Sequence, residues 1–393
     1  GAQPAADAAG EAADTLHDAF HDALRRTLND HALDHHHLTD RLASRPIWHH
    51  FRNGVHHFSA NALTLARVLE RREIDTGSFA SFLLYGDPGD PRHSVIEGIR
   101  RPEAGVVARY GPVGSLDPER WFEFRHLPHR GRSVSGWAGE ISHALTESAK
   151  RIAPLTTNAT LFLSGGVDSR IIGAALLAGG CEFRSITLGD SRNFETRVAA
   201  AVARSLGCPN ELIIRDVHWY LRALSRSAFL SGGTYDFTHA HFRQALGRFD
   251  AAPAASTVLL GDFAEVFSKL LHTVGTEETK PASPAEFFER YDRIRISHYR
   301  PPNAERTLQL FQAGARDEAV ARMCALIEKR YAECLDVSDD PRIVYDVFLR
   351  WQSAGAVATW QMFNDLHAAV QVRNVVMDAD VVDLVMRLPS ELR

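Results

Sequence analysis

A run of six residues near the middle of the chain has the side-chain types and spacing of a phosphate-binding loop. The run is Ser164, Gly165, Gly166, Val167, Asp168 and Ser169. Adjacent glycines allow a tight turn that brings backbone N–H groups close to an anion. The serines add hydroxyl donors, and the carboxylate of Asp168 is placed to hold a Mg²⁺ ion that bridges phosphate oxygens. The lysine of a Walker A loop is absent, so transfer of a γ-phosphate is not indicated.

The elements on either side of this loop strengthen the interpretation. An apolar run at residues 160–163 predicts a short strand before the loop, and a helix is predicted from Ser169 to the pair Gly179 and Gly180. A helix N-terminus offers free N–H groups and a partial positive charge to an anion. The alternative, a Gly-Gly turn before a serine-capped helix, does not explain six specific residues at this place.

The pattern around the loop is an alternation of strands and helices. A helix is predicted at residues 138–153, then strands at 160–163, 183–188, 211–214 and 257–260, with a helix at 194–206 ended by Gly207. This alternation predicts an α/β fold with a doubly wound parallel sheet. In such sheets ligands bind at the carboxyl ends of the strands, where the strand order reverses. From residue 284 onward the pattern is largely helical.

The loop resembles the SGGxDS signature of the PP-loop ATP pyrophosphatases. Residues 163–170, with the sequence LSGGVDSR, are most similar to the class B asparagine synthetase group, which includes β-lactam synthetases and lasso-peptide cyclases. The resemblance implies a PP-loop, HUP-like synthetase domain that binds ATP and Mg²⁺ and holds the pyrophosphate portion in this loop. It also implies activation of a carboxyl group as an acyl-adenylate.

Two further stretches resemble the same family in its nucleotide-binding elements. Residues 185–189, SITLG, resemble the second strand, which implies that the backbone of Ile186, Thr187 and Leu188 lies along the adenine. Residues 260–267, LGDFAEVF, resemble the family's GEGxDEVF element. On that match Gly261 contacts the nucleotide, Glu265 binds Mg²⁺ together with Asp168, and Asp262 lies near the acyl centre.

Other stretches resemble the family more loosely, and some of them depart from it. Residues 371–373, QVR, and 388–389, LP, resemble an ExR…lP segment, in which the family's Glu is replaced by Gln371. Phe263 stands where the family keeps glycine, and the lysine that follows the lP pair in the family has no counterpart up to Arg393. The glutaminase cysteine of glutamine-dependent members is missing, because the first cysteine is Cys181. We therefore expect no glutaminase activity.

These observations predict three segments. Residues 1–45 are expected to form a helical or flexible segment, and residues 46–132 a reduced, glutaminase-like (Ntn-type) α+β remnant with several strands. Residues 133–393 are expected to form the asparagine-synthetase-like ATP-binding domain with a helical C-terminal part. The resemblance extends over roughly residues 79–393 and is strongest at the loop.

A second polar stretch lies between the third and fourth predicted strands of the α/β region. In the family this zone faces the substrate, which implies that Tyr235, Asp236 and His239 orient a carboxylate or an amine nucleophile. A loop-to-helix junction in which Asp236 caps the helix explains the same residues equally well. Both interpretations stay open.

The 20 histidines are concentrated at residues 35–37, 49–50 and 56–57. Neither an HExxH sequence nor a His-with-Cys pattern accompanies them, so packing or surface histidines are favoured over a metal site.

Composition narrows the class of protein. A formal net charge of −5 gives no basic field for nucleic acid, and 45% hydrophobic residues suffice for a core. Four cysteines without a CxxC pair fit a reducing cytoplasm, and no run of about 18 apolar residues predicts a membrane span. We expect a cytoplasmic protein with no nucleic-acid or membrane partner. A homodimer or a protein partner is compatible with the sequence.

The expected function is ATP-dependent adenylation of a small-molecule or peptide carboxylic acid, followed by amide formation with an amine or ammonia, in specialised metabolite biosynthesis. Closure of a macrolactam or β-lactam ring is an alternative within the ligase class. A non-catalytic nucleotide-binding or partner-binding homologue is the alternative from another class, because Phe263, Gln371 and the missing lysine favour it while the intact loop opposes it.

Overall fold

The structure is a computed structural model of the 393-residue chain. It describes residues 35–111, 113–233, 241–248, 256–261, 308–348 and 363–392, together with 264, 281, 283, 285–291 and 306.

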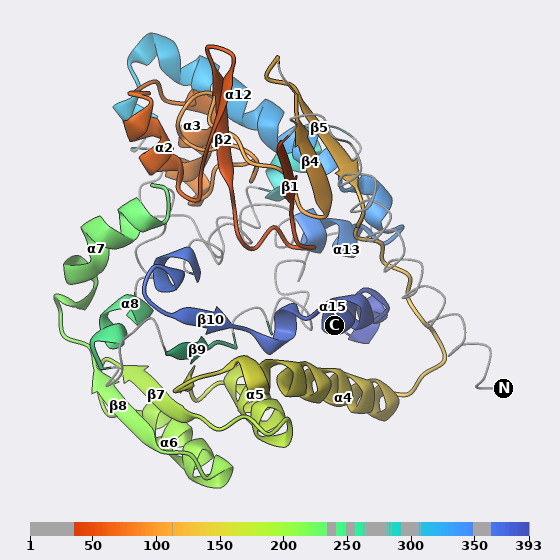
Figure 1. Cartoon of the computed structure of the whole chain (residues 1–393). Coiled ribbons are helices and arrows are strands. Elements are labelled where there is room, and N and C mark those ends of the chain that lie inside the picture. The colour runs from red at the N-terminus through yellow and green to blue at the C-terminus, as the bar shows by residue number, and fades with distance from the viewer. Residues whose placement is uncertain are drawn as a thin grey trace.

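A five-stranded parallel sheet forms the centre of the C-terminal part (Figure 1). Its strands are β6 (Thr160–Phe162), β7 (Arg184–Gly189), β8 (Asn210–Ile214), β9 (Thr257–Leu259) and β10 (Gln371–Arg373), in the order β10-β9-β6-β7-β8. The strand order reverses at β6, which pairs with β7 on one side and with β9 on the other. The predicted α/β class with a parallel sheet is therefore confirmed.

Helices surround this sheet. They are α4 (Val134–Ile152), α5 (Val167–Ala178), α6 (Phe194–Leu206), α7 (Trp219–Leu230), α8 (His241–Ala245) and α15 (Ala379–Met386). Helix α5 packs between α4 and α6, and α15 packs on α4. Local capping explains their ends: Ser133 caps α4, Asn193 and Thr196 form a capping box on α6, and Gly207 ends α6 at φ 68°.

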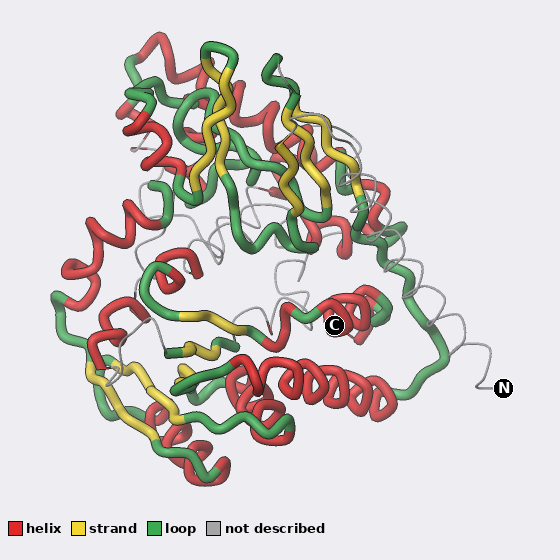
Figure 2. The backbone as a smooth tube through the Cα atoms, in the orientation of Figure 1, coloured by secondary structure: helices red, strands yellow, loops and turns green. Residues whose placement is uncertain are grey.

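Short antiparallel strands lie apart from the parallel sheet and build the N-terminal module (Figure 2). Strands β1 (His35–Leu38), β4 (Val106–Tyr110) and β5 (Leu116–Arg120) form one sheet, and β2 (Trp48–Arg52) and β3 (Val55–Ser59) form a hairpin. Helices α2 (Ala62–Val68) and α3 (Thr76–Tyr85) complete the module, and the long α12 (Ala313–Ala332) packs along α3.

The remaining short elements are α13 (Pro341–Asp346) and six 3₁₀ helices among the residues described: Ala153–Leu155, Leu246–Arg248, Leu308–Leu310, Leu335–Val337, Val375–Met377 and Ser390–Leu392. No helix within the described ranges is both long enough and apolar enough to cross a bilayer.

Three local expectations differ from the structure. His35–Leu38, expected to be helical or flexible, pairs with β4 as strand β1, because the partner strand that fixes it lies about 70 residues away. The apolar run at residues 79–85, which lies in the region expected to have several strands, belongs to helix α3, whose start is fixed by the Asp75 carboxylate accepting from the Ser78 N–H at 3.0 Å. Gln371–Arg373, within the region expected to be helical, forms β10 alongside β9.

One hydrophobic core joins most of the molecule. Leu84 and Phe124 from the N-terminal part belong to the same buried cluster as Leu161 and Ile186 of the parallel sheet. Polar contacts add to this attachment: Arg41 pairs with Asp383 at 2.5 Å. The proposed boundaries at residues 45 and 132 stay predictions, but the segments around them share packing.

Asn61 attaches the N-terminal module to α7. Its side-chain oxygen accepts the Thr64 N–H at 2.9 Å and so caps α2. Its amide nitrogen donates to the Phe229 and Leu230 carbonyl oxygens at 2.6 and 3.0 Å. These carbonyls end α7, where a helix has acceptors without intrahelical partners.

Histidine and aromatic rings fill the space between the hairpin and the β1-β4-β5 sheet. The Tyr110 ring lies 4.9 Å from that of His49, 5.3 Å from that of His56 and 4.8 Å from that of Phe58. Within the described part of the chain, neither ring nitrogen of His49 nor the Tyr110 hydroxyl has a hydrogen-bond partner. No group of three or more His, Cys, Asp or Glu side chains in that same part is arranged to hold a metal ion. The rings of His49 and His56 thus pack against Tyr110.

We predict that acidification destabilises the N-terminal module through His49. Burial, reinforced by His56, Arg100 and His50, lowers the pKa of His49 from 6.5 to about 4. On acidification the unfolded chain therefore binds the proton at a higher pH than the folded chain does. His49 leaves the free energy of unfolding undiminished above pH 6.5 and lowers it progressively down to pH 4, by about 3 kcal/mol for a shift of this size. Hydrogen exchange of β2 and β4 amides at pH 7 and pH 5 measures this loss.

His49→Phe keeps a ring against Tyr110 and removes the titration, so exchange in β2 and β4 should lose most of its pH dependence beyond the intrinsic chemical rate. His143→Gln, an exposed position on α4, is the matched control and should retain it. An unchanged pH dependence in His49→Phe would contradict the assignment.

Candidate functional site

The carboxyl end of β6 is fixed to β7 before the loop begins. The Leu163 N–H donates to the Ile186 carbonyl oxygen at 2.9 Å, and the Thr187 hydroxyl donates to the Leu163 carbonyl oxygen at 2.9 Å. The ladder between the two strands ends at the pair Phe162 and Ile186, while β7 continues to Gly189. Beyond this pair, Leu188 is the next residue of β7 whose backbone N–H and C=O groups point toward the β6 side. Since β6 has ended there, these groups face the space past its last residue.

Hydrogen bonds inside the loop hold it in one conformation. The Ser169 hydroxyl lies 3.0 Å from the Ser164 carbonyl oxygen and 3.2 Å from that of Gly166. The two serine hydroxyl oxygens are 3.0 Å apart, and the Gly166 N–H donates to Ser164 Oγ at 3.1 Å. Ser169 is buried and Ser164 is exposed. Ser169 therefore braces the loop, and the Ser164 hydroxyl faces the solvent side.

Helix α5 begins directly in the loop, with Gly166 as its N-cap. No side chain caps this end, so the N–H groups of the first turn point out of the helix toward the loop. Asp168 lies in the first turn and is half-buried. The arrangement combines N–H donors, the positive end of a helix dipole and one carboxylate, which is the donor set that a magnesium-bound phosphate needs.

Close approaches require a glycine at position 165 and leave little room for a side chain at Gly261. A Cβ on Gly165 would lie 2.7 Å from the Glu195 carbonyl oxygen and 2.9 Å from Glu195 Cγ. A Cβ on Gly261 would lie 3.3 Å from Ile172 Cγ1 and 3.6 Å from Ser169 Cα. The loop is therefore pressed against the start of α6, and the segment after β9 is pressed against α5.

These elements enclose a cavity of about 330 Å³ at the carboxyl ends of the strands. It is lined by Phe162, Leu163, Ser164, Asp168, Ser169, Ile186, Leu188, Glu195, Arg215, Phe242 and Gly261. The loop contributes Ser164, Asp168 and Ser169 to this lining, and β7 contributes Ile186 and Leu188. Its size lies in the range of small-molecule pockets, and its place is the reversal of the strand order, where ligands bind in parallel sheets.

The predicted site residues divide into three groups. Ser164, Asp168, Ser169, Ile186, Leu188 and Gly261 meet at this cavity. Gly165 and Gly166 form the loop, while the Thr187 side chain is buried and bonds to Leu163 and Asn210 rather than facing the cavity. Five predicted residues lie outside the described residues: Asp262, Glu265, Tyr235, Asp236 and His239. Their roles, including that of Glu265 as a metal ligand, stay predictions.

Five cavity residues were not predicted as site residues: Phe162 and Leu163 just before the loop, and Glu195, Phe242 and Arg215 from other elements. Glu195 lies in the first turn of α6, and Phe242 of α8 packs its ring 4.4 Å from that of Phe162. Arg215 follows β8 directly, and its backbone N–H donates to the Gly189 carbonyl oxygen at 2.8 Å. Arg215 follows a strand predicted at residues 211–214, which is a signal for the carboxyl edge of the sheet, but its place in the same cavity as the loop depends on the strand order.

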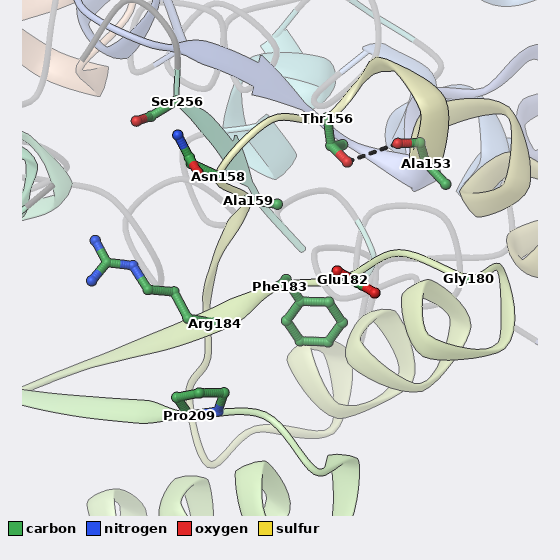
Figure 3. A pocket seen from close by; sticks show the side chains of 10 residues that line it. All are labelled: Ala153, Thr156, Asn158, Ala159, Gly180, Glu182, Phe183, Arg184, Pro209 and Ser256. Carbon is green, nitrogen blue, oxygen red and sulfur yellow. Dashed lines mark hydrogen bonds between the residues drawn. The ribbon is translucent and has the colours of Figure 1, made fainter. Parts of the chain in front are cut away.

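A larger hollow of about 730 Å³ lies at the opposite, amino ends of the strands (Figure 3). Its lining includes Asn158, Arg184, Pro209 and Ser256, next to the starts of β6, β7, β8 and β9. Arg184 Nε donates to Thr160 Oγ1 at 3.2 Å. We assign the site to the smaller cavity, because it contains the loop and the helix N-terminus and lies at the carboxyl ends of the strands.

No protein-family model and no curated protein matches the sequence. Among solved structures, the NMN synthetase from Francisella tularensis aligns with 52% of this chain and 96% of its own chain, at 13% identity and a TM-score of 0.25. A similarity of this size does not establish an activity, so the function proposed below rests on the residues of the site.

Proposed function

We propose that this chain uses Mg²⁺-ATP to adenylate a carboxyl group and then joins the acyl group to an amine or ammonia as an amide. The observation that carries the proposal is the loop of residues 164–169 at the reversal of the strand order, opening directly into the N-terminus of α5. Anion-binding N–H groups, a carboxylate and an adjoining cavity meet there.

The phosphate end of the nucleotide is assigned to the loop. The N–H groups at the start of α5 and the Ser164 hydroxyl hold the pyrophosphate portion, and Asp168 holds Mg²⁺. Mg²⁺ would neutralise charge on the phosphate oxygens. The loop conformation is fixed by the protein's own hydrogen bonds, so its donors need no reorganisation when negative charge develops on departing pyrophosphate.

The adenine end is assigned to the extended edge of β7. Leu188 presents a backbone donor and acceptor beyond the last pair with β6, which suits the hydrogen-bonding edge of a purine. Ile186 and Phe242 supply apolar surface in the same cavity. Such a placement supports the nucleotide lying across the β6–β7 boundary, with its α-phosphate near the loop.

For the binding of the acyl and amine substrates, the proposal draws on the sequence resemblance, because the residues concerned lie outside the described part of the chain. Glu265 is the proposed second Mg²⁺ ligand, and Asp262 the proposed neighbour of the acyl centre. Joining two molecules and closing a ring share the adenylation step and differ in whether acid and amine are on one molecule. Both outcomes fall within the proposal, and the product distinguishes them.

ATP–pyrophosphate exchange with Mg²⁺ across a panel of carboxylic acids and amino acids is the first test. We expect Asp168→Asn to lower exchange about 100-fold or more, because it removes the metal-binding charge while keeping the side-chain shape. Asp317→Asn, on the exposed face of α12, should leave exchange unchanged. Full exchange by Asp168→Asn would refute the assignment. ATP binding without exchange for any acid would favour a non-catalytic homologue.

Gly165→Ala is expected to weaken nucleotide binding through geometry rather than charge. The added methyl group would lie 2.7 Å from the Glu195 carbonyl oxygen, so the loop or the start of α6 must shift. We expect at least a tenfold loss of pyrophosphate affinity by calorimetry. Gly139→Ala is the matched control, since a Cβ on Gly139 of α4 meets no atom within 4 Å. Equal affinity in both variants would exclude a shape-dependent cradle.

A further inference from the structure

Arg215 lines the candidate cavity from β8, two strands away from the strand that carries the loop. It follows β8, which is separated from β6 by β7. Neighbouring strands lie about 4.8 Å apart, so the end of β8 is about 10 Å from the strand that carries the loop. The side chain lines the same cavity as Ser164 and Leu188 and is 19% exposed.

Two neighbours fix the guanidinium group of Arg215. Its Nε forms an ion pair with Asp190, the residue after β7, at 2.8 Å from Oδ1 but without the geometry of a hydrogen bond. Its Nη1 donates to the Tyr220 hydroxyl of α7 at 2.9 Å, and the guanidinium carbon lies 5.9 Å from the Tyr220 ring centroid. A guanidinium has five N–H donors and two flat faces. These two partners account for only part of that capacity, so donors and a face remain for a ligand.

The lining of the cavity decides which part of a nucleotide meets Arg215. The loop and the start of α5 provide the anion-binding groups at one end. Ile186 and Leu188 line the same cavity and belong to β7, the strand between β6 and β8. A phosphate has no reason to lie over apolar side chains, whereas a purine ring buries its faces there. A planar cation beyond such a ring can stack on it or donate to its ring nitrogens.

We propose that Arg215 is a binding residue for the nucleobase, held in place by Asp190 and Tyr220. The assignment deepens the proposed function and rests on it, because it takes the loop as the phosphate end. Arg215 thus acts on the adenosine half of ATP, and the pyrophosphate half is bound without it.

Binding of ATP, adenosine and inorganic pyrophosphate to the full chain, each with Mg²⁺, separates the two halves. Arg215→Ala should weaken ATP and adenosine about tenfold each, the size of a stacking contact with a base, and leave pyrophosphate unchanged. Tyr220→Phe keeps the ring and removes the hydroxyl that accepts from Nη1, so we expect a smaller loss of the same two ligands. This second variant keeps the test informative if Arg215→Ala folds poorly.

Arg222→Ala is the matched control. Arg222 lies on α7, pairs with Asp216 at 2.8 Å and is not part of the cavity wall, so all three affinities should match those of the unmodified chain. Weaker pyrophosphate binding with unchanged adenosine binding in Arg215→Ala would overturn the proposal and make Arg215 a phosphate ligand. Unchanged affinities, or an unmodified chain in which adenosine does not compete with ATP, would overturn it as well. If the unmodified chain binds neither ATP nor pyrophosphate, the proposed function itself fails.

Discussion

The hydrogen bond from the Ser169 hydroxyl to the Ser164 carbonyl oxygen is the constraint on which the site depends. It closes the first turn of α5 onto the end of β6, so the strand, the loop and the helix form one rigid unit. In this closed loop Gly165 lies against the backbone of Glu195, in the first turn of α6. The segment after β9 then approaches α5 at Gly261. The closed loop and these two close approaches together bring three elements around the cavity.

The unit of β6, the loop and α5 lies where the strand order of the sheet reverses. Strand β6 is the first strand of the sheet in sequence, and later strands add on its two sides. The loop is consequently central rather than at an edge. Both neighbouring strands contribute to the cavity, β7 through its extended edge and β9 through Gly261. A site of this kind depends on several strands of the sheet at once. The sheet in turn shares one buried hydrophobic cluster with the N-terminal part, which supports it.

Sequence reasoning located the elements whose signals are local. Helix α6 runs over Phe194–Leu206, the predicted range, because its capping box and terminal glycine are written in adjacent residues. Strands β1 and β10 were missed, since each has only three or four residues and exists only through a distant partner. In the site, the loop was visible as a contiguous motif. Arg215 was not, because its role depends on β8 lying beside β7, a fact of the fold rather than of spacing.

The double contact of Asn61 limits which residues that position tolerates. For capping α2 alone, Asn, Asp, Ser and Thr are nearly interchangeable. The same side chain also donates to the last carbonyls of α7, and among these four only asparagine offers an amide donor together with the capping oxygen. Aspartate would place a negative charge against the negative end of the α7 dipole. In an evolving lineage this position would therefore look far more restricted than a surface helix cap.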